Sequence, residues 1–300
     1  MYYAEPVYRP PSEAYSLLIQ ASVGCLSAAQ GHCYYCGSWL LDREIPEKKF
    51  RIRPVRDILR DMDEARAQMG RAVRRVFLLD SNALVIPARA LERISRHAYE
   101  LFPNLERVSV YACAQDILRK SDEDLRRVRE AGITLLYLGL ESGCEQVLEL
   151  INKGVTAEET VGACRRAHEA GFDLSLTVIL GLGGKRLSRE HAVDTGEILS
   201  RIEPRYVGAL TLMVVPGTPM EAWIREGSFQ ELNQEEILLE LRWMLEHIRV
   251  SREVVLRTNH ASNYLPLSGT LPADKGRLLR VLNRALDRKI PLRPEHLRGL

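Results

Sequence analysis

The sequence has 300 residues, of which 46% are hydrophobic and 27% are charged. This length can accommodate two domains, although an α/β barrel of this size is commonly one unit. The net charge of +2, from 42 basic and 40 acidic side chains, gives no sign of a nucleic-acid or anionic-membrane partner. Because the first residues lack a secretory signal and no apolar run approaches the roughly 20 residues of a membrane helix, we expect a soluble, cytoplasmic protein. Clustered cysteines there more often bind metal or do catalysis than form disulfides.

An extended arm rich in Pro and Tyr, residues 1–15, precedes short apolar runs that alternate with amphipathic stretches of helix length. The runs read as parallel strands buried on both faces and joined by right-handed crossovers. The expected strands are residues 16–23, 74–80, 107–113, 134–141, 173–182 and 206–215. The expected helices between them are residues 54–69, 88–101, 121–130, 157–170 and 188–202. This α/β pattern fits an open sheet or a barrel, and in both cases ligands collect at the carboxyl ends of the strands.

Polar residues and glycines follow the expected strands at that end. These segments are Asp80-Ser81-Asn82, Tyr111-Ala112-Cys113-Ala114-Gln115, Gly139-Leu140-Glu141-Ser142-Gly143, Gly181-Leu182-Gly183-Gly184 and Val215-Pro216-Gly217-Thr218-Pro219. A single glycine there is better explained by a tight turn, but the repetition at successive strand ends favours a ligand site. The sequence has no GxGxxG, GxxxxGK[ST], GxSxG or HExxH motif, so nucleotide-phosphate binding and the common hydrolase sites are not predicted.

Three of the six cysteines directly follow the first expected strand, as Cys25-x7-Cys33-x2-Cys36. Three thiolates cannot complete a tetrahedral structural metal site, but they can hold three irons of a four-iron cluster and leave the fourth iron open. A zinc site completed by His32 is the alternative that the spacing permits. The remaining cysteines form no second motif: Cys164 lies on an amphipathic helix, and Cys113 and Cys144 lie at strand ends.

A cysteine triplet after the first strand of a repeating β/α chain resembles the radical S-adenosylmethionine (radical SAM) superfamily. The usual spacing there is CxxxCxxC with an aromatic residue before the last cysteine, a place taken here by Tyr35. The similarity covers roughly residues 8–275, over which the chain resembles short, single-domain members with a cobalamin-independent, HemN/Elp3-like core. It rests also on the phrases Tyr8-Arg9-Pro10-Pro11, Phe77-Leu78-Leu79-Asp80, Gly139-Leu140-Glu141-Ser142-Gly143, Ile179-Leu180-Gly181-Leu182-Gly183-Gly184, Pro216-Gly217-Thr218-Pro219 and Asn259-His260-Ala261-Ser262-Asn263.

The resemblance implies a partial (β/α)6 TIM-like barrel of parallel strands, with a [4Fe–4S] cluster and SAM as cofactors. The divisions expected from it are the arm at residues 1–15, the barrel at 16–220 and a C-terminal extension at 221–300. Reductive cleavage of SAM would give methionine and a 5′-deoxyadenosyl radical, which abstracts hydrogen from a small-molecule substrate. The enzyme would be oxygen-sensitive and would take electrons from a flavodoxin- or ferredoxin-type donor.

The resemblance also assigns residues to the cofactors. Cys25, Cys33 and Cys36 would bind three irons, and the amino and carboxylate groups of SAM would chelate the open iron. For the adenine of SAM, the implied contacts are the backbone of Tyr35 together with Gly181, Val215 and Pro216. The amino group of SAM would be bound by Asp80, Ser81 and Asn82. The ribose would be bound by Glu141 and Ser142.

Two departures from the family pattern keep other reactions open. The spacer at residues 26–32 is longer than usual, although a longer loop adds little closure entropy. Relatives are commonly rich in glycine or acidic residues where this chain has Ser81 and Asn82. Atypical SAM cleavage that transfers a 3-amino-3-carboxypropyl group is therefore one alternative, and a zinc-stabilised binding protein without catalysis is another. In either enzyme reading, His32 is a polar loop residue or a further ligand.

The C-terminal part predicts an amphipathic helix at residues 235–250, a strand at 254–257 and a last helix at 274–286. Between the last two lies a polar run, residues 258–264, that either contacts substrate or closes the barrel as a capped loop. The substrate-side candidates are Asn259, His260 and Asn263, together with Tyr111 from the third strand end. The sequence names neither the substrate nor the oligomeric state.

Overall fold

The computed structural model describes residues 1–299. The chain divides into two compact units that interleave along the sequence. The first unit comprises Met1–His32, Ser38–Leu138 and Gly162–Leu174; the second comprises Cys33–Gly37, Gly139–Val161 and the chain from Ser175 onward. The cysteine segment therefore changes from one unit to the other between His32 and Cys33.

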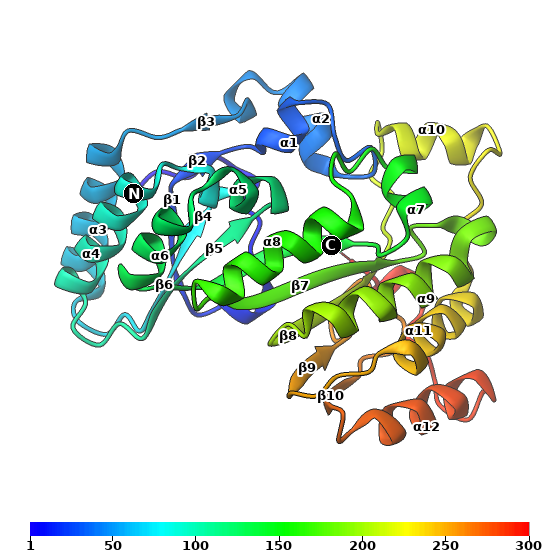
Figure 1. Cartoon of the computed structure of the whole chain (residues 1–300). Helices are drawn as coiled ribbons and strands as arrows, with labels where there is room; N and C mark the ends of the chain where they lie inside the picture. Colours follow the sequence, from blue (N-terminus) through cyan, green and yellow to red (C-terminus); the bar gives the residue numbers. More distant parts are fainter. Residues whose placement is uncertain (300) are drawn as a thin grey trace. The chain divides into compact units, whose positions relative to one another are not determined.

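The described residues form one mostly parallel sheet and a separate short antiparallel pair, β2–β3 (Figure 1). The strands are β1 (Leu17–Gln20), β2 (Ser22–Val23), β3 (Arg51–Ile52), β4 (Arg75–Leu79), β5 (Arg107–Ala112), β6 (Ile133–Glu141), β7 (Asp173–Leu180), β8 (Tyr206–Thr211), β9 (Val254–Arg257) and β10 (Ser268–Leu271). The helices are α1 (Leu26–Ala29), α2 (Gly37–Glu44), α3 (Val55–Met69), α4 (Ala88–Leu101), α5 (Ala114–Arg119), α6 (Asp122–Glu130), α7 (Glu145–Leu150), α8 (Ala157–Glu169), α9 (Gly184–Ile202), α10 (Pro219–Arg225), α11 (Gln234–His247) and α12 (Lys275–Leu286). Strands alternate with helices along most of the chain and helices dominate its end, which confirms the α/β class of a partial barrel with a C-terminal helical extension.

The first unit is built on parallel pairing in the order β1-β4-β5-β6. Helices α3, α4 and α6 pack beside one another in this unit (Figure 1). Their buried residues recur at helical spacing, as Ile58, Met62 and Ala65 do on α3, because only one stripe of each helix faces the strands. Burial of such stripes stabilises the packing of helices on strands in this unit.

In the second unit β7 pairs in parallel with β8 and β8 with β9, whereas β10 is antiparallel to β9. Helix α11 packs against both α9 and α12. The approach of α9 to α11 requires Gly196, since a Cβ there would lie 2.7 Å from the carbonyl oxygen of Met244. Buried and half-buried residues alternate along β7 and β8, so the expectation that every strand is buried on both faces is wrong for these two.

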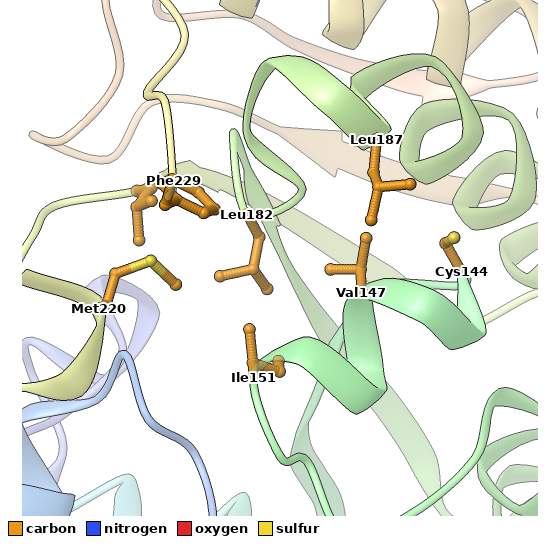
Figure 2. Packing of buried hydrophobic residues seen from close by; sticks show 8 residues of the cluster. Cys144, Val147, Ile151, Leu182, Leu187, Met220 and Phe229 are labelled. Carbon is orange, nitrogen blue, oxygen red and sulfur yellow. The ribbon is translucent and has the colours of Figure 1, made fainter. Parts of the chain in front are cut away.

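A hydrophobic cluster of the second unit is formed around α7. Figure 2 shows Val147 of α7 directed toward Leu187, and Ile151 directed toward Leu182. Met220 from α10 and Phe229 complete the wall opposite α7. Tyr35, from the cysteine segment, packs against the edge of this cluster. The CxxC segment is therefore attached to the core of its unit by a side chain as well as by its backbone.

Several elements differ from the sequence expectation. Helix α9 begins at Gly184, four residues before the expected start, because the glycines before Ser188 suggested a loop. The short elements α1, α2, α5, α7, α10, β3 and β10 were not predicted, since two to eight residues give too little periodicity to recognise. The arm is more than extended chain: it contains a short 3₁₀ turn at Pro11–Glu13. The carboxylate of Glu13 is buried and accepts hydrogen bonds from Arg107 Nη2 and Tyr137 Oη, at 2.6 and 2.7 Å.

None of the helices within residues 1–299 has the length and apolar character to cross a membrane.

Candidate functional site

The first unit holds Cys25 between two side chains that follow β4. Asp80 Oδ2 accepts the N–H of Gly24 at 3.1 Å, and Asn82 Oδ1 accepts the N–H of Leu26 at 3.2 Å. Gly24 has a φ of 69°, and a Cβ there would lie 2.3 Å from the carbonyl oxygen of Lys48, so no other residue fits this turn. The backbone on both sides of Cys25 is thus fixed by polar atoms from one strand end.

Asp80 is buried, and burial raises the pKa of its carboxyl despite the hydrogen bond from Gly24. Its other oxygen, Oδ1, accepts the hydroxyl of Ser81 at 3.1 Å. The three residues expected to bind the SAM amino group therefore lie together at the end of β4. Two of them, Asp80 and Asn82, also hold the cysteine loop, a role that the sequence analysis did not foresee.

The spacer between the cysteines is folded rather than loose. Cys25 is the N-cap residue of α1, and the N–H of His32 donates to the carbonyl of Ser27 at 2.9 Å. The hydroxyl of Ser27 lies 3.7 Å from the sulfur of Cys113. The backbone N–H of Cys113 in turn donates to the buried carboxyl of Asp116 at 3.0 Å. Burial raises the pKa of Asp116 to about 6.

The second unit holds Cys33 and Cys36 with main-chain hydrogen bonds. The N–H groups of Cys33 and Tyr34 donate to the carbonyls of Asn152 and Ile151, at 2.9 and 3.0 Å. These two carbonyls end α7, where helix carbonyls need external donors. The N–H of Cys36 closes the turn on the carbonyl of Cys33 at 3.0 Å, and Cys33 itself has a φ of 64°. The CxxC turn therefore caps the C-terminal end of α7.

Tyr35 and Glu141 lie beside this turn. Burial, the nearby Glu141 carboxylate and the thiols of Cys33 and Cys36 together raise the pKa of Tyr35 well above its ordinary value. Glu141 Oε1 accepts a hydrogen bond from Lys153 Nζ at 3.1 Å, and both side chains are largely buried. A Cβ at Gly139 would lie 1.9 Å from the same oxygen, so this strand end needs glycine to admit the carboxylate.

Ser142 is fully buried, and its hydroxyl makes two hydrogen bonds. It accepts from the N–H of Cys144 at 2.9 Å and lies 2.8 Å from Nδ1 of His191. The other ring nitrogen of His191, Nε2, lies 3.0 Å from the carbonyl oxygen of Ile179, which can only accept. Nε2 therefore carries the proton, and Ser142 donates to Nδ1. Burial lowers the pKa of His191 to about 4, so the ring is neutral.

The remaining expected SAM contacts lie at the ends of β7 and β8. The N–H of Gly181 donates to Oε1 of Glu240 at 2.6 Å, a buried partner from α11 that sequence reasoning missed. Val215 is half-buried and its carbonyl accepts the hydroxyl of Thr218 at 2.7 Å, whereas Pro216 is exposed. The signal for Glu240 was present, since Glu240 falls on the apolar stripe of its helix, where a carboxylate is out of place.

The substrate-side candidates are divided between the units. In the first unit Tyr111 packs edge-on against Phe77, with ring centroids 5.0 Å apart, and burial raises its pKa. In the second, Asn263 is buried, and its side chain bonds Thr211 Oγ1 and the carbonyl of Ala209, both at 2.8 Å. Asn259 is exposed and His260 is half-buried.

Two arginines near the end of the chain bind the polar run. Arg293 Nη1 donates to the carbonyls of His260, Ala261 and Asn263. Arg298 reaches the carbonyls of Ser262 and Leu212, at 2.7 and 2.9 Å. These contacts favour the interpretation of residues 258–264 as a capped loop. The side chain of Asn263 in particular is already hydrogen-bonded within the protein.

The structure thus gathers the expected residues into two groups, one with Cys25 in the first unit and one with Cys33 and Cys36 in the second. Throughout residues 1–299, no three His, Cys, Asp or Glu side chains surround a ready position for a metal ion. The binding of one cluster by all three thiols therefore stays a prediction. The donors themselves suit it: none of the three cysteines is in a disulfide, each is half-buried, and thiolates are the ligands that iron–sulfur clusters take.

The comparisons with known proteins identify the family. A family model of the radical SAM superfamily matches residues 21–198, more than half of the chain. The chain belongs to the radical SAM superfamily. Its cofactors are a [4Fe–4S] cluster and SAM, and it is an enzyme, which leaves the zinc-stabilised binding protein without support.

Individual relatives are distant. An uncharacterized protein of Methanocaldococcus jannaschii is 24% identical over 237 residues, which are 78% of this chain and 72% of that protein. Methylornithine synthase superposes with a TM-score of 0.53 at 19% identity, covering 78% of this chain and 63% of that one. Coproporphyrinogen III oxidase from Escherichia coli gives 0.54 at 16% identity, covering 77% and 50%. This chain thus spans less than two thirds of either solved enzyme, and the two likenesses establish the fold only.

Proposed function

We propose that this enzyme cleaves SAM reductively and uses the resulting radical to abstract hydrogen from a small-molecule substrate. The observation that carries the proposal is the placement of the three cysteines on ordered backbone, with Cys25 held by the end of β4 and the CxxC turn held by α7. If the three thiolates bind one cluster, they account for three irons and leave the fourth iron open for SAM. The bound and reduced cluster would supply the one electron needed to cleave SAM to methionine and a 5′-deoxyadenosyl radical.

The chain's own residues orient the cofactor and exclude water around it. We assign the neighbourhood of Tyr35 and Glu141 to the nucleoside of SAM. Glu141 is a suitable acceptor for ribose hydroxyls because its ion pair with Lys153 fixes the carboxylate through one oxygen. The hydroxyl of Ser142 hydrogen-bonds with His191 and the N–H of Cys144, so in this proposal Ser142 shapes the turn beside the ribose.

Transfer of a 3-amino-3-carboxypropyl group is kept as the second candidate, because one observation favours it. Asp80 and Asn82 use side-chain oxygens to hold the backbone of the cysteine loop, which leaves fewer acceptors for the SAM amino group. With fewer acceptors for its amino group, SAM would bind in another orientation, and a different carbon–sulfur bond would be cleaved. The two reactions leave different nucleosides, so they are readily separated.

The test is anaerobic reconstitution of the full chain with iron and sulfide, followed by reduction with dithionite in the presence of SAM. We expect a cluster whose electron paramagnetic resonance spectrum changes when SAM is added, and 5′-deoxyadenosine as the product on chromatography. 5′-Methylthioadenosine as the main product would instead establish the second candidate. A protein that binds zinc and never forms a SAM-responsive cluster would overturn both.

The substrate and the electron donor belong to the same proposal. A small molecule is favoured by the near-neutral charge of the chain, which offers no electrostatic attraction for a polyanion. A flavodoxin- or ferredoxin-type protein would supply the electron. Replacing dithionite with a reduced flavodoxin and its reductase should sustain SAM cleavage. SAM cleavage that dithionite sustains but the reduced flavodoxin does not would argue for another kind of donor.

A further inference from the structure

Glu240 is a carboxyl group buried on the apolar side of α11, with none of its side chain exposed. Its two oxygens bind different elements. Oε1 accepts the N–H of Gly181, immediately after β7, and Oε2 hydrogen-bonds with the hydroxyl of Ser188 on α9, at 2.6 and 2.5 Å. A residue 59 positions later in the chain thus fixes the backbone at a strand end.

The conformation that Glu240 fixes is one that only glycine adopts easily. Gly181 has a φ of 85°, and a Cβ there would lie 3.0 Å from Ile237 Cδ1, one turn before Glu240 on the same helix. Helix α11 therefore supplies both the surface against which this turn packs and the acceptor that holds its N–H. Without that acceptor, a buried backbone donor would be left unsatisfied.

A neighbouring strand end is held in the same manner from α9. His191 joins Ser142 to the carbonyl of Ile179, as described above, and its Nε2 lies 3.7 Å from Oε1 of Glu240. Thr195, one turn later on α9, accepts the N–H of Gly143 at 2.8 Å. The turns after β6 and β7 are thus shaped by one continuous buried polar network carried on α9 and α11.

The network is neutral at pH 7, which explains how it persists without a counter-ion. Burial raises the pKa of Glu240 to about 8, and burial lowers the pKa of His191 to about 4. Each group keeps the hydrogen-bonding form that its partners require. An apolar side chain could replace a neutral carboxyl group that served only packing. It could not replace Glu240 without loss, because Glu240 accepts the N–H of Gly181 at the end of β7.

We propose that Glu240 and His191 are positioning residues for SAM: they hold the turns after β7 and β6 in the shape that receives the cofactor's nucleoside, without touching it. The inference rests on the proposed function, which places SAM at these strand ends. It adds two residues outside the segments that the family resemblance marks, on helices that the sequence suggested only for packing.

The test compares Glu240→Leu with Glu240→Gln in the reconstituted full-length enzyme. Glutamine keeps an acceptor for Gly181, whereas leucine removes it. We expect Glu240→Leu to raise the dissociation constant for SAM about tenfold, the effect of losing roughly one buried hydrogen bond. Iron content and the rate of SAM cleavage at saturating SAM should change by less than about threefold, and Glu240→Gln should restore near-normal affinity.

A second readout does not depend on activity. Amide hydrogen exchange of the cluster-free protein should show faster exchange in the peptide that contains Gly181 for Glu240→Leu, and not for Glu240→Gln. The matched control is Glu246→Leu, an exposed glutamate on the same helix, which should change neither measurement. If Glu240→Leu fails to fold, Ser188→Ala is the substitute, since it removes only the bond to Oε2 and should weaken SAM binding about threefold.

Normal SAM affinity in folded Glu240→Leu, or in Ser188→Ala where leucine does not fold, would overturn the inference and leave the proposed function standing. A wild-type protein whose cluster never responds to SAM would instead overturn the proposed function, and the inference with it. Weakened affinity that glutamine does not restore would assign Glu240 to packing alone and would likewise overturn the positioning role.

Discussion

The two units hold their cysteines by different means. In the first unit, side-chain oxygens of Asp80 and Asn82 accept the N–H groups on both sides of Cys25. In the second, main-chain carbonyls at the end of α7 accept the N–H groups of Cys33 and Tyr34. Mutation can remove a side-chain acceptor but not a carbonyl. The Cys25 side is therefore the one that single substitutions can loosen, and the CxxC side depends on the packing that keeps α7 in place.

The largest effects on cluster binding are expected from replacing the cysteines themselves. Here we expect the same loss of cluster binding whichever unit the cysteine belongs to. Replacing Cys25, Cys33 or Cys36 with alanine removes one of three thiolates and should abolish cluster binding in each case. Iron content and visible absorbance after anaerobic reconstitution measure the outcome. Cys164→Ala is the control, because this buried thiol has its pKa raised to about 12 by burial and should not bind iron.

A cluster that survives in Cys25→Ala would contradict this prediction for the first unit only. It would mean that another residue, such as His32, is the third ligand.

The next effect tests the packing that supports the CxxC side. Ile151 is fully buried in the cluster around α7, and its carbonyl receives the N–H of Tyr34. Ile151→Ala should lower the unfolding free energy by about 2–5 kcal/mol, because it leaves a cavity. The folded fraction should still retain its iron, since the carbonyl remains. Chemical denaturation and iron analysis of the same samples separate the two effects. Iron loss with unchanged stability would contradict the prediction that Ile151 acts through packing.

The pH dependence of stability tests the buried carboxyl of the second unit. Burial raises the pKa of Glu240 from the ordinary glutamate value of 4.5 to about 8, so between these values the folded state keeps a proton that the unfolded state has lost. The unfolding free energy should therefore fall as pH rises through this window, by at most about 1.4 kcal/mol per pH unit. Glu240→Gln, which cannot ionise, should show a flatter profile by urea denaturation. His191 is present in both proteins, so its contribution to the pH dependence of stability cancels in the comparison. Parallel stability profiles for the wild-type protein and Glu240→Gln would contradict a raised pKa for Glu240.

The sequence predicted the parts of the fold that depend on local pattern. The strands before Asp80 and Glu141 and the long helices carry strong periodicity, and they were located to within a few residues. The motif with Cys25, Cys33 and Cys36 pointed to the family because it depends on spacing. Tertiary contacts remained invisible: nothing local links Glu240 to Gly181, 59 residues earlier.

Gly184 illustrates why the predicted start of a helix was wrong. Gly184 reads as a helix breaker, yet α9 begins there. The glycine is required by the neighbouring chain, since a Cβ would lie 2.8 Å from the carbonyl oxygen of Gln230. The same limit applies to Asp80 and Asn82. Their position at a strand end indicated a ligand site, and only the folded structure reveals that the cysteine loop uses the same atoms.

The smallest effect is the sharpest test of the contrast between the units. Asn82→Ala removes the acceptor for the N–H of Leu26 and a long donation, at 3.4 Å, to Asp116 Oδ2, and should cost about 1 kcal/mol of stability. Its effect on Cys25 should nevertheless be visible as faster loss of iron to a chelator. Ser81→Ala is the matched control, because the hydroxyl of Ser81 bonds only Oδ1 of Asp80 among the contacts described. If both variants lose iron at the wild-type rate, the side chains after β4 do not hold Cys25, and both cysteine segments owe their order to the main chain.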